Sequence, residues 1–188
     1  MNKGVLVLII IGIVLFLAGG WLVRGLNSAV ILDESVNQAW SQVENQLQRR
    51  NDLIPNLVNT VKGFAAQERQ VFTEVTRLRS QWAQAKSREE KINTAGKIGT
   101  ALSRLLLVAE RYPELKSNQN FLTLQSQLEG TENRIAVERR RYNQAVERFN
   151  AYRRTVFGSL FARLRGLNKP AEYFKAEEVA REVPEVKF

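Results

Sequence analysis

The sequence contains no cysteine and no histidine. Without cysteine there is no disulfide bond, no thiol nucleophile and no thiolate metal site. Without histidine the chain lacks the commonest general base and the commonest metal ligand. Neither a phosphate-binding loop nor a glycine-rich dinucleotide motif occurs. We therefore predict no catalytic, metal-binding or cofactor-binding residues and a protein that is not an enzyme. Catalysis by carboxylates alone stays open, but no pair of carboxylates stands out.

Charge is absent from one long stretch near the N-terminus. From Gly4 through Val23 every residue is uncharged and most are apolar. About 20 residues of helix, at roughly 1.5 Å per residue, match the thickness of a bilayer core. Lys3 and Arg24 flank the stretch, and Trp21 stands where an interfacial aromatic residue is expected. The stretch is longer than the apolar core of a usual signal peptide, so we predict a retained single-pass transmembrane anchor.

Proline is scarce as well, with four in 188 residues, and no segment alternates apolar and polar residues as a strand would. Apolar residues instead recur at steps of three and four over 57–85, 95–112 and 124–156, as they do in the helices of a bundle. The links between these segments are short, which implies antiparallel neighbours. We predict an all-α fold, an elongated antiparallel up-down helical bundle with an N-terminal transmembrane helix.

The links carry their own helix signals. Ser87 and Glu90 have the spacing of a capping box, and Pro113 should end a helix near Arg111. Gly166 is a candidate helix stop after a short amphipathic piece. We divide the chain into an anchor (1–26), a bundle (27–156) and a C-terminal amphipathic segment with a tail (157–188). The tail should pack on the bundle or meet a partner through its aromatic residues, Tyr173, Phe174 and Phe188.

A polar stretch, "RRNDLIPNL", interrupts the apolar pattern at residues 49–57. Asp52 can cap a helix whose first turn contains Pro55, whereas a proline inside a continuous helix would cost about 3 kcal/mol. We therefore expect a kink or break near 51–55. The interpretation that we favour is a structural joint, and the alternative is a corner that binds a partner. The residues of this joint are Arg49, Arg50, Asn51, Asp52, Pro55 and Asn56.

A second polar interruption, "TENRIA" at 131–136, suggests what closes over the joint. It supplies Glu132, Asn133 and Arg134. We expect Glu132 to pair with Arg49 or Arg50, and Asn133 to satisfy backbone groups that the proline leaves free. Buried polar contacts of this kind can set the register of a bundle.

Positive charge gathers in the last third of the chain. Nine arginines against two glutamates stand between Arg134 and Arg165, in a chain of net charge +9. This basic face is either a solvated helix surface or a site for anionic lipid, which attracts each nearby basic residue by about 1 kcal/mol. Nucleic acid is disfavoured, because no binding motif accompanies the charge. After Arg134, the residues of the basic face are Arg139, Arg140, Arg141, Arg148, Arg153, Arg154, Arg163 and Arg165.

Several blocks together resemble the LemA family of bacterial proteins. They are "RRNDLIPNLV", "YPELK", "TENRIA" and the ending "YFKAEEVAREVPEVKF". The resemblance covers nearly all of the chain after the anchor. It implies a helical bundle with an N-terminal membrane anchor, and it brings no enzymatic activity and no catalytic residues. Many members look like lipoproteins with a lipidated cysteine where this chain has Gly20, so a retained helix is expected here, with the bundle on the outer face of the bacterial inner membrane.

These features favour a membrane-anchored, non-enzymatic scaffold or adaptor. Its expected contacts are membrane lipid, a protein partner that the sequence does not identify, and further copies of the chain. The alternative is a lipid-binding or membrane-remodelling module that uses the basic face. A third possibility is an accessory subunit of a membrane protease or transporter.

Overall fold

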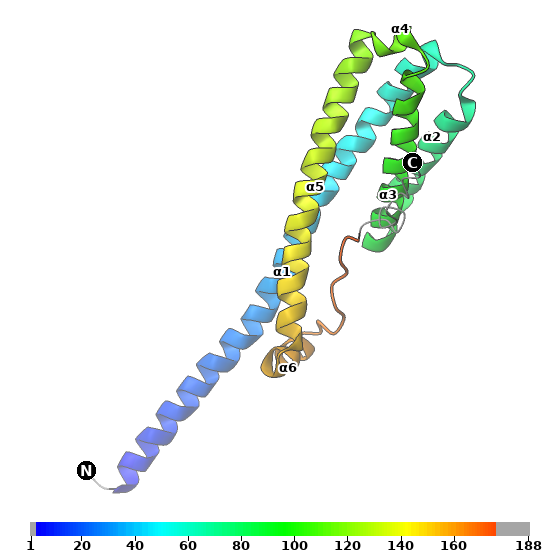
Figure 1. Cartoon of the computed structure of the whole chain (residues 1–188). Helices are drawn as coiled ribbons and strands as arrows, with labels where there is room; N and C mark the ends of the chain where they lie inside the picture. Colours follow the sequence, from blue (N-terminus) through cyan, green and yellow to red (C-terminus); the bar gives the residue numbers. More distant parts are fainter. Residues whose placement is uncertain (1–2, 176–188) are drawn as a thin grey trace, which may run out of the picture. The chain divides into compact units, whose positions relative to one another are not determined.

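The computed structural model of the chain describes residues 3–175, which form six α-helices and no strand (Figure 1). The all-α fold predicted from the sequence is confirmed. The described residues fall into two compact units, one made of 3–40 with 141–173 and the other of 41–140 with Phe174 and Lys175. The helices are α1 (Lys3–Phe64), α2 (Arg69–Gln84), α3 (Arg88–Ala109), α4 (Pro113–Lys116), α5 (Gln119–Arg154) and α6 (Val156–Leu164).

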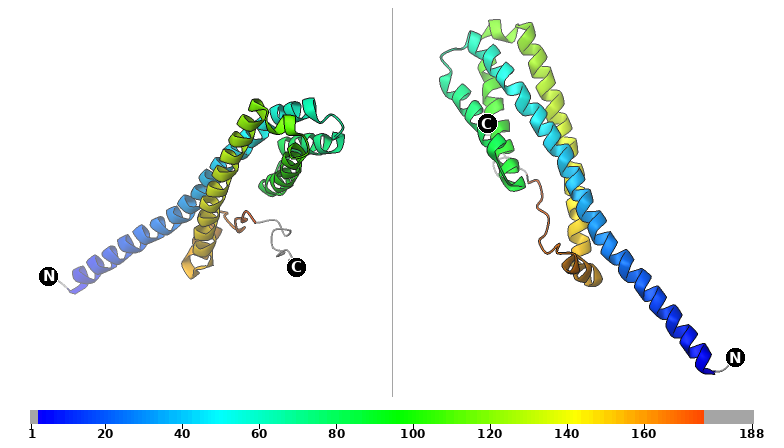
Figure 2. Two further views of the ribbon diagram at one scale, coloured as in Figure 1. Left: turned by 45° about the horizontal axis from the view of Figure 1, so that its top comes forward. Right: turned by 180° about the vertical axis from the view of Figure 1, so that it is seen from behind.

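Within the unit of 41–140, successive helices reverse direction. Arg79 of α2 hydrogen-bonds Asn51 of α1. A straight helix would put residues 28 positions apart at a separation of roughly 42 Å. The chain therefore turns back after α1, and α2 and α3 lie side by side in each view (Figure 1, Figure 2). Glu132 of α5 then reaches Arg50 of α1. This is the up-down arrangement that the short links predict.

The core of this unit consists of the apolar residues that recur at steps of three and four. Full burial of one such side chain is worth about 1.5–3 kcal/mol. Phe64 falls within the apolar repeat of 57–85, which predicts a core position, but it is 37% exposed at the end of α1. The largest fully buried apolar side chains of the unit are Leu47, Ile54, Leu57, Leu78, Ile98, Leu105, Leu115 and Phe121.

Two boundaries differ from those expected. Of the kink or break predicted near 51–55, the break is wrong, because α1 continues through Pro55 to Phe64, and the kink stays a prediction. The continuous helix predicted over 57–85 is also wrong, because the chain turns at 65–68, after Gly63 has weakened the helix by about 1 kcal/mol relative to alanine. Glu68 in this turn pairs with Arg111 at 2.9 Å, a contact that requires the reversal. Tertiary packing has moved the break by about three helical turns.

The start of α3 confirms the predicted capping box. The Ser87 hydroxyl accepts the backbone N–H of Glu90, and the Glu90 carboxylate accepts the backbone N–H groups of Lys86 and Ser87. These bonds, the one from Lys86 first, lower the pKa of Glu90 below its ordinary value. At its other end α3 stops at Ala109 and Pro113 opens α4, as the position of the proline predicts.

In the unit of 3–40 with 141–173, α1 and α5 run antiparallel. Trp40 of α1 packs against Tyr142 of α5 with ring centroids 5.6 Å apart, and Gly25 of α1 accepts a hydrogen bond from Tyr152. The N-terminal part of α1 contains an apolar stretch that is long enough to cross a membrane, by its length and composition, and none of it is buried inside the protein. The N-terminal apolar helix expected from the sequence is therefore present.

The chain continues after α6 in a segment without helix, residues 166–175, which we call the strap. Gly166 stops α6 with a φ of 75°, a conformation that favours glycine, and the N–H of Leu167 then bonds the carbonyl of Ala162 at 2.8 Å. The strap has no helix over 171–175. Phe188, one of the aromatic residues expected to pack on the bundle or meet a partner, lies outside the described residues. The division of the chain at residues 26 and 156 stays a prediction.

Candidate functional site

The residues of the predicted joint divide into buried and exposed ones. Arg50 and Asn51 each keep only 3% of their surface exposed. Pro55 is half-buried inside α1. The exposed members are Arg49, Asp52 and Asn56. Because buried polar residues need partners, Arg50 and Asn51 are the members that decide what the joint does.

Arg50 connects three helices. Its Nη1 donates to Oε1 of Glu132 on α5 at 3.0 Å, and its Nη2 donates to the carbonyl of Ala95 on α3 at 2.7 Å. The expected pairing of Glu132 with an arginine of the joint is present, with Arg50 as the partner. Thr131, beside Glu132, is also buried and bonds the carbonyl of Gln127 within α5. Asn133 and Arg134 are exposed.

The carbonyl of Asn51 explains how α1 continues through Pro55. Proline has no N–H, so it leaves the carbonyl four residues earlier without its helical partner. Nε of Arg79 on α2 donates to this carbonyl at 3.1 Å. The expectation that Asn133 would satisfy the backbone here is wrong, since the donor comes from α2. The sequence contained no signal for Arg79, which is one of several arginines on an exposed helix surface.

The joint also has polar atoms without a partner. Within residues 3–175, nothing hydrogen-bonds the side-chain amide of Asn51 or the Nε of Arg50, although these atoms are buried. Burying such a group costs about 1–3 kcal/mol. The joint is therefore a locally costly structure. We infer that the joint sets the register of α1, α3 and α5, because Arg50 reaches Glu132 and the Ala95 carbonyl together only when these helices are aligned in this way.

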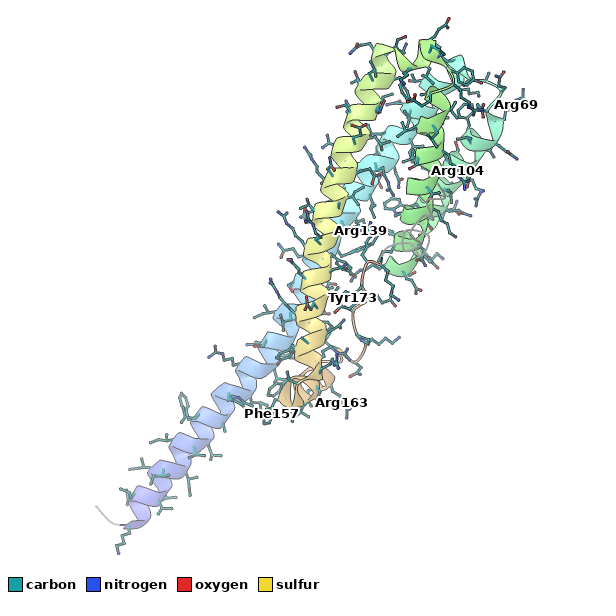
Figure 3. The ribbon with its side chains drawn as sticks, viewed as in Figure 1. Arg69, Arg104, Arg139, Phe157, Arg163 and Tyr173 are labelled. Carbon is teal, nitrogen blue, oxygen red and sulfur yellow. The ribbon has the colours of Figure 1, made fainter. Side chains whose placement is uncertain are left out.

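Among the described residues, the joint does not contain a cluster of metal-binding side chains. No group of three or more carboxylates could hold a metal ion in residues 3–175. A hollow lies elsewhere, on the surface of α2 and α3, and Arg104 pairs there with Glu74 at 3.3 Å. Figure 3 labels Arg104. The lining of the hollow also includes Arg69 and Arg77. The hollow shares no residue with the predicted joint.

The arginines of the basic face divide into two groups. Arg139 donates to the carbonyl of Lys175 at 3.3 Å and stacks over the ring of Phe174 at 4.1 Å. Arg153 donates to the carbonyls of Leu167 and Asn168. Both therefore hold the strap. Besides Arg134, six further members are exposed: Arg140, Arg141, Arg148, Arg154, Arg163 and Arg165.

Two further residues of α5 hold the strap, and the sequence did not single them out for this role. The side-chain amide of Asn150 bonds Ala171 in both directions, Nδ2 to the carbonyl at 2.8 Å and the N–H to Oδ1 at 2.9 Å. The hydroxyl of Tyr142 donates to the carbonyl of Glu172 at 2.7 Å. The only available signal was their polarity within an apolar repeat, a pattern that surface residues share.

The last helix, α6, packs on α1 beside the apolar stretch. Trp21 of α1 contacts Phe157 and Phe161, with ring centroids 4.8 and 5.2 Å away. Gly25 makes room for this contact, because a Cβ at this position would lie 2.1 Å from the Phe161 ring. The hydroxyl of Tyr152 donates to the carbonyl of Gly25 at 2.7 Å, and desolvation by burial raises the pKa of Tyr152.

These features correspond to a known family. The sequence pattern of the LemA family matches residues 39–188. The chain belongs to the LemA family. Among curated relatives, the Magnetosome proteins MamQ 1 and MamQ 2 of Paramagnetospirillum magneticum are each 28% identical to this chain over an alignment of 205 residues. The alignment covers 95% of this chain and 74% of each relative. Magnetosome protein MamQ of Magnetospirillum gryphiswaldense is 26% identical over 150 residues, 66% of this chain and 55% of its own.

The extent of the LemA match separates two parts of the chain. It includes the polar joint, the residues that hold the strap, and α6, but it begins after the apolar stretch. With its N-terminal apolar helix, this LemA protein is a membrane-associated helical protein.

Proposed function

We propose that this LemA protein is a single-pass, non-enzymatic scaffold or adaptor of the bacterial inner membrane. The observation that carries the proposal is the continuity of α1. One uninterrupted helix contains both the apolar stretch and the helix around which the unit of 41–140 is built. The apolar stretch and this unit are thus joined by helix and not by a flexible linker.

The polar joint supports the same proposal. Pro55 would weaken α1 in the middle of the unit by about 3 kcal/mol. Arg79 and Arg50 instead tie this part of α1 to α2, α3 and α5. A rigid platform is of use to a protein that presents a surface to others. An enzyme would need convergent catalytic groups in a pocket. In the hollow on α2 and α3, the carboxylate of Glu74 is instead paired with Arg104.

Photo-crosslinking in native membranes tests the scaffold. A photoreactive residue replaces exposed Leu107 on α3, and the matched control replaces buried Leu105 two positions earlier. We expect discrete protein adducts from position 107 and none from position 105. An adduct with the mass of two copies identifies self-association. The absence of discrete adducts from position 107 and from Leu122, a second exposed apolar position, contradicts the scaffold.

The side of the membrane needs its own test. We propose the outer face, because lipoprotein-like members of the family favour it and the nearly balanced charges that flank the apolar stretch lean slightly toward an N-terminus inside. Protease added to intact spheroplasts should cleave within 41–175. Protection of this region until the membrane is permeabilised would place it in the cytoplasm.

A second candidate function is a lipid-binding module. One observation favours it, namely the exposed apolar side of α6 beside the arginines that remain exposed. Arg139 and Arg153 no longer count toward a lipid surface, because they hold the strap. Reconstituting the full-length chain in neutral and in anionic vesicles distinguishes the two functions. Only a lipid-binding or membrane-remodelling module changes the shape of the vesicles, and it requires anionic lipid to do so.

A further inference from the structure

The surface of α6 divides into three sides. Gly158, Phe161 and Ala162 are buried. Ser159 and Arg163 are polar and exposed. At 3.6 residues per turn, the remaining positions form a third side next to the polar one. Its members are apolar, and each exposes between 50 and 81% of its surface: Val156, Phe157, Leu160 and Leu164.

This third side is continuous with the apolar part of α1. Phe157 and Phe161 of α6 contact Trp21, which belongs to the uncharged stretch, and Figure 3 shows Phe157 between α6 and α1. Phe16 and Leu17, about one turn earlier on α1, are exposed as well. Tryptophan is enriched at the boundary between the bilayer core and the headgroups. The contacts with Trp21 therefore place α6 at this boundary.

Charge around α6 complements a lipid surface. Arg154 precedes the helix, Arg163 lies in its last turn and Arg165 follows it, and all three are exposed. A short helix with an apolar side and flanking basic residues is typical of segments that lie in the headgroup region of anionic bilayers. The apolar side would otherwise leave four large side chains in water.

We propose that α6 is an interfacial helix, held by Trp21 and Gly25 so that its exposed apolar side enters the anionic leaflet at the end of the α1 span. The inference rests on the proposed membrane anchor and adds a second point of attachment. Two points fix the tilt and rotation of α1 about its own axis, whereas a single span leaves its rotation free. The occupant of the apolar side is thus lipid, and a second copy of the chain is the competing outcome.

The chain has no cysteine, so a single introduced cysteine can carry an environment-sensitive fluorophore with no background. The full-length chain is reconstituted in vesicles of phosphatidylcholine with phosphatidylglycerol. Probes at Leu160→Cys on the apolar side and Ser159→Cys on the polar side form a matched pair one residue apart. A third probe at Val14→Cys, in the middle of the apolar stretch, reports insertion of the anchor. Lipids with a nitroxide near the headgroup or deep in the acyl chain then quench each probe according to its depth.

We expect the nitroxide near the headgroup to quench the Leu160 probe roughly twofold or more above the Ser159 probe, and the deep nitroxide to quench the Val14 probe. Equal quenching at 159 and 160, with Val14 quenched, overturns the interfacial helix and leaves the anchor standing. A blue-shifted but unquenched Leu160 probe shows burial against protein and also overturns it. An unquenched Val14 probe contradicts the anchor itself.

Gly25 provides a variant that acts on the docking of α6. Gly25→Ala places a methyl group against Phe161, whereas Gly20→Ala adds one in a place with no atom within 4 Å. We expect the difference between the 160 and 159 probes to shrink in Gly25→Ala and to persist in Gly20→Ala. An unchanged difference in Gly25→Ala would mean that α1 does not set the orientation of α6.

Discussion

Arg79 donates a hydrogen bond from its Nε to the backbone carbonyl of Asn51 at 3.1 Å, the carbonyl that Pro55 leaves without its helical partner. A side chain of α2 thus repairs a defect in α1. The contact explains how α1 continues without interruption through a proline. The hydrogen bond also makes the effects of substituting Arg79 and Pro55 depend on one another, although no atom of Pro55 takes part in it.

Arg79→Met should lower the free energy of unfolding by about 1–3 kcal/mol, because it leaves a buried acceptor unpaired. In the Pro55→Ala background an N–H is restored, and the same substitution should cost less than about 1 kcal/mol. Urea unfolding of the full-length chain in detergent, followed by circular dichroism, measures both values. Arg77→Met, on the exposed surface of the same helix, serves as the control. Equal costs in the two backgrounds would show that Arg79 does not act on the proline defect.

Glu132→Leu should destabilise the chain by about 1–2 kcal/mol, below the 3–5 kcal/mol typical of fully buried pairs. The expected loss of stability is smaller because solvent reaches the pair: the Glu132 side chain is 43% exposed, while that of Arg50 is 4% exposed. Glu132→Gln keeps an acceptor for Arg50 and should cost less than Glu132→Leu. The control is Glu129→Leu, one turn earlier and exposed. If chemical denaturation finds the control as costly as Glu132→Leu, the pairing of Glu132 with Arg50 does not stabilise the chain.

Asn150→Ala should free the strap without unfolding α5. It removes both hydrogen bonds to Ala171, so the Ala171 amide should exchange its hydrogen about five- to tenfold faster, as expected for the loss of roughly 1 kcal/mol. Hydrogen exchange read by mass spectrometry over 166–175 gives the measurement. Gln144→Ala, on the exposed side of α5, should leave the strap protected. Equal exchange in both variants would mean that Asn150 does not hold the strap.

Glu90→Gln should show a pH-dependent loss of stability. The pKa of Glu90 in the folded chain lies below its ordinary value of 4.5. Its stabilising effect is therefore present above the ordinary pKa and disappears as pH falls through the lowered one. The wild type should melt at a higher temperature than Glu90→Gln at neutral pH, and the difference should close below about pH 4.5.

Thermal unfolding of both chains between neutral and acid pH checks this expectation. Glu89→Gln, also in the first turn of α3 but outside the capping box, should show a smaller difference at neutral pH. A difference that widens as pH falls would reverse the sign and reject the carboxylate as the cause.

Much of the architecture could be predicted because it depends on local patterns. The apolar steps of three and four located the core, Ser87 with Glu90 located a helix start, and Pro113 located a helix end. The pairing of Glu132 with an arginine of the joint could also be predicted, since both belong to polar interruptions of the apolar repeat and polar groups beside a core need partners. The continuation of α1 through Pro55 could not be predicted, because the hydrogen bond that compensates for the proline comes from Arg79, a residue 28 positions from Asn51.

The sequence by itself determined the helical class, the uncharged N-terminal stretch and the absence of cysteine and histidine chemistry, because each depends only on residue type and spacing. The tertiary structure alone decided where α1 ends, which arginine enters the interior and which arginines hold the strap. It alone decided that Phe161 of α6 packs against Trp21, in space that Gly25 leaves free. A helix surface reads the same in sequence whether water, lipid or another helix covers it, and only packing distinguishes them.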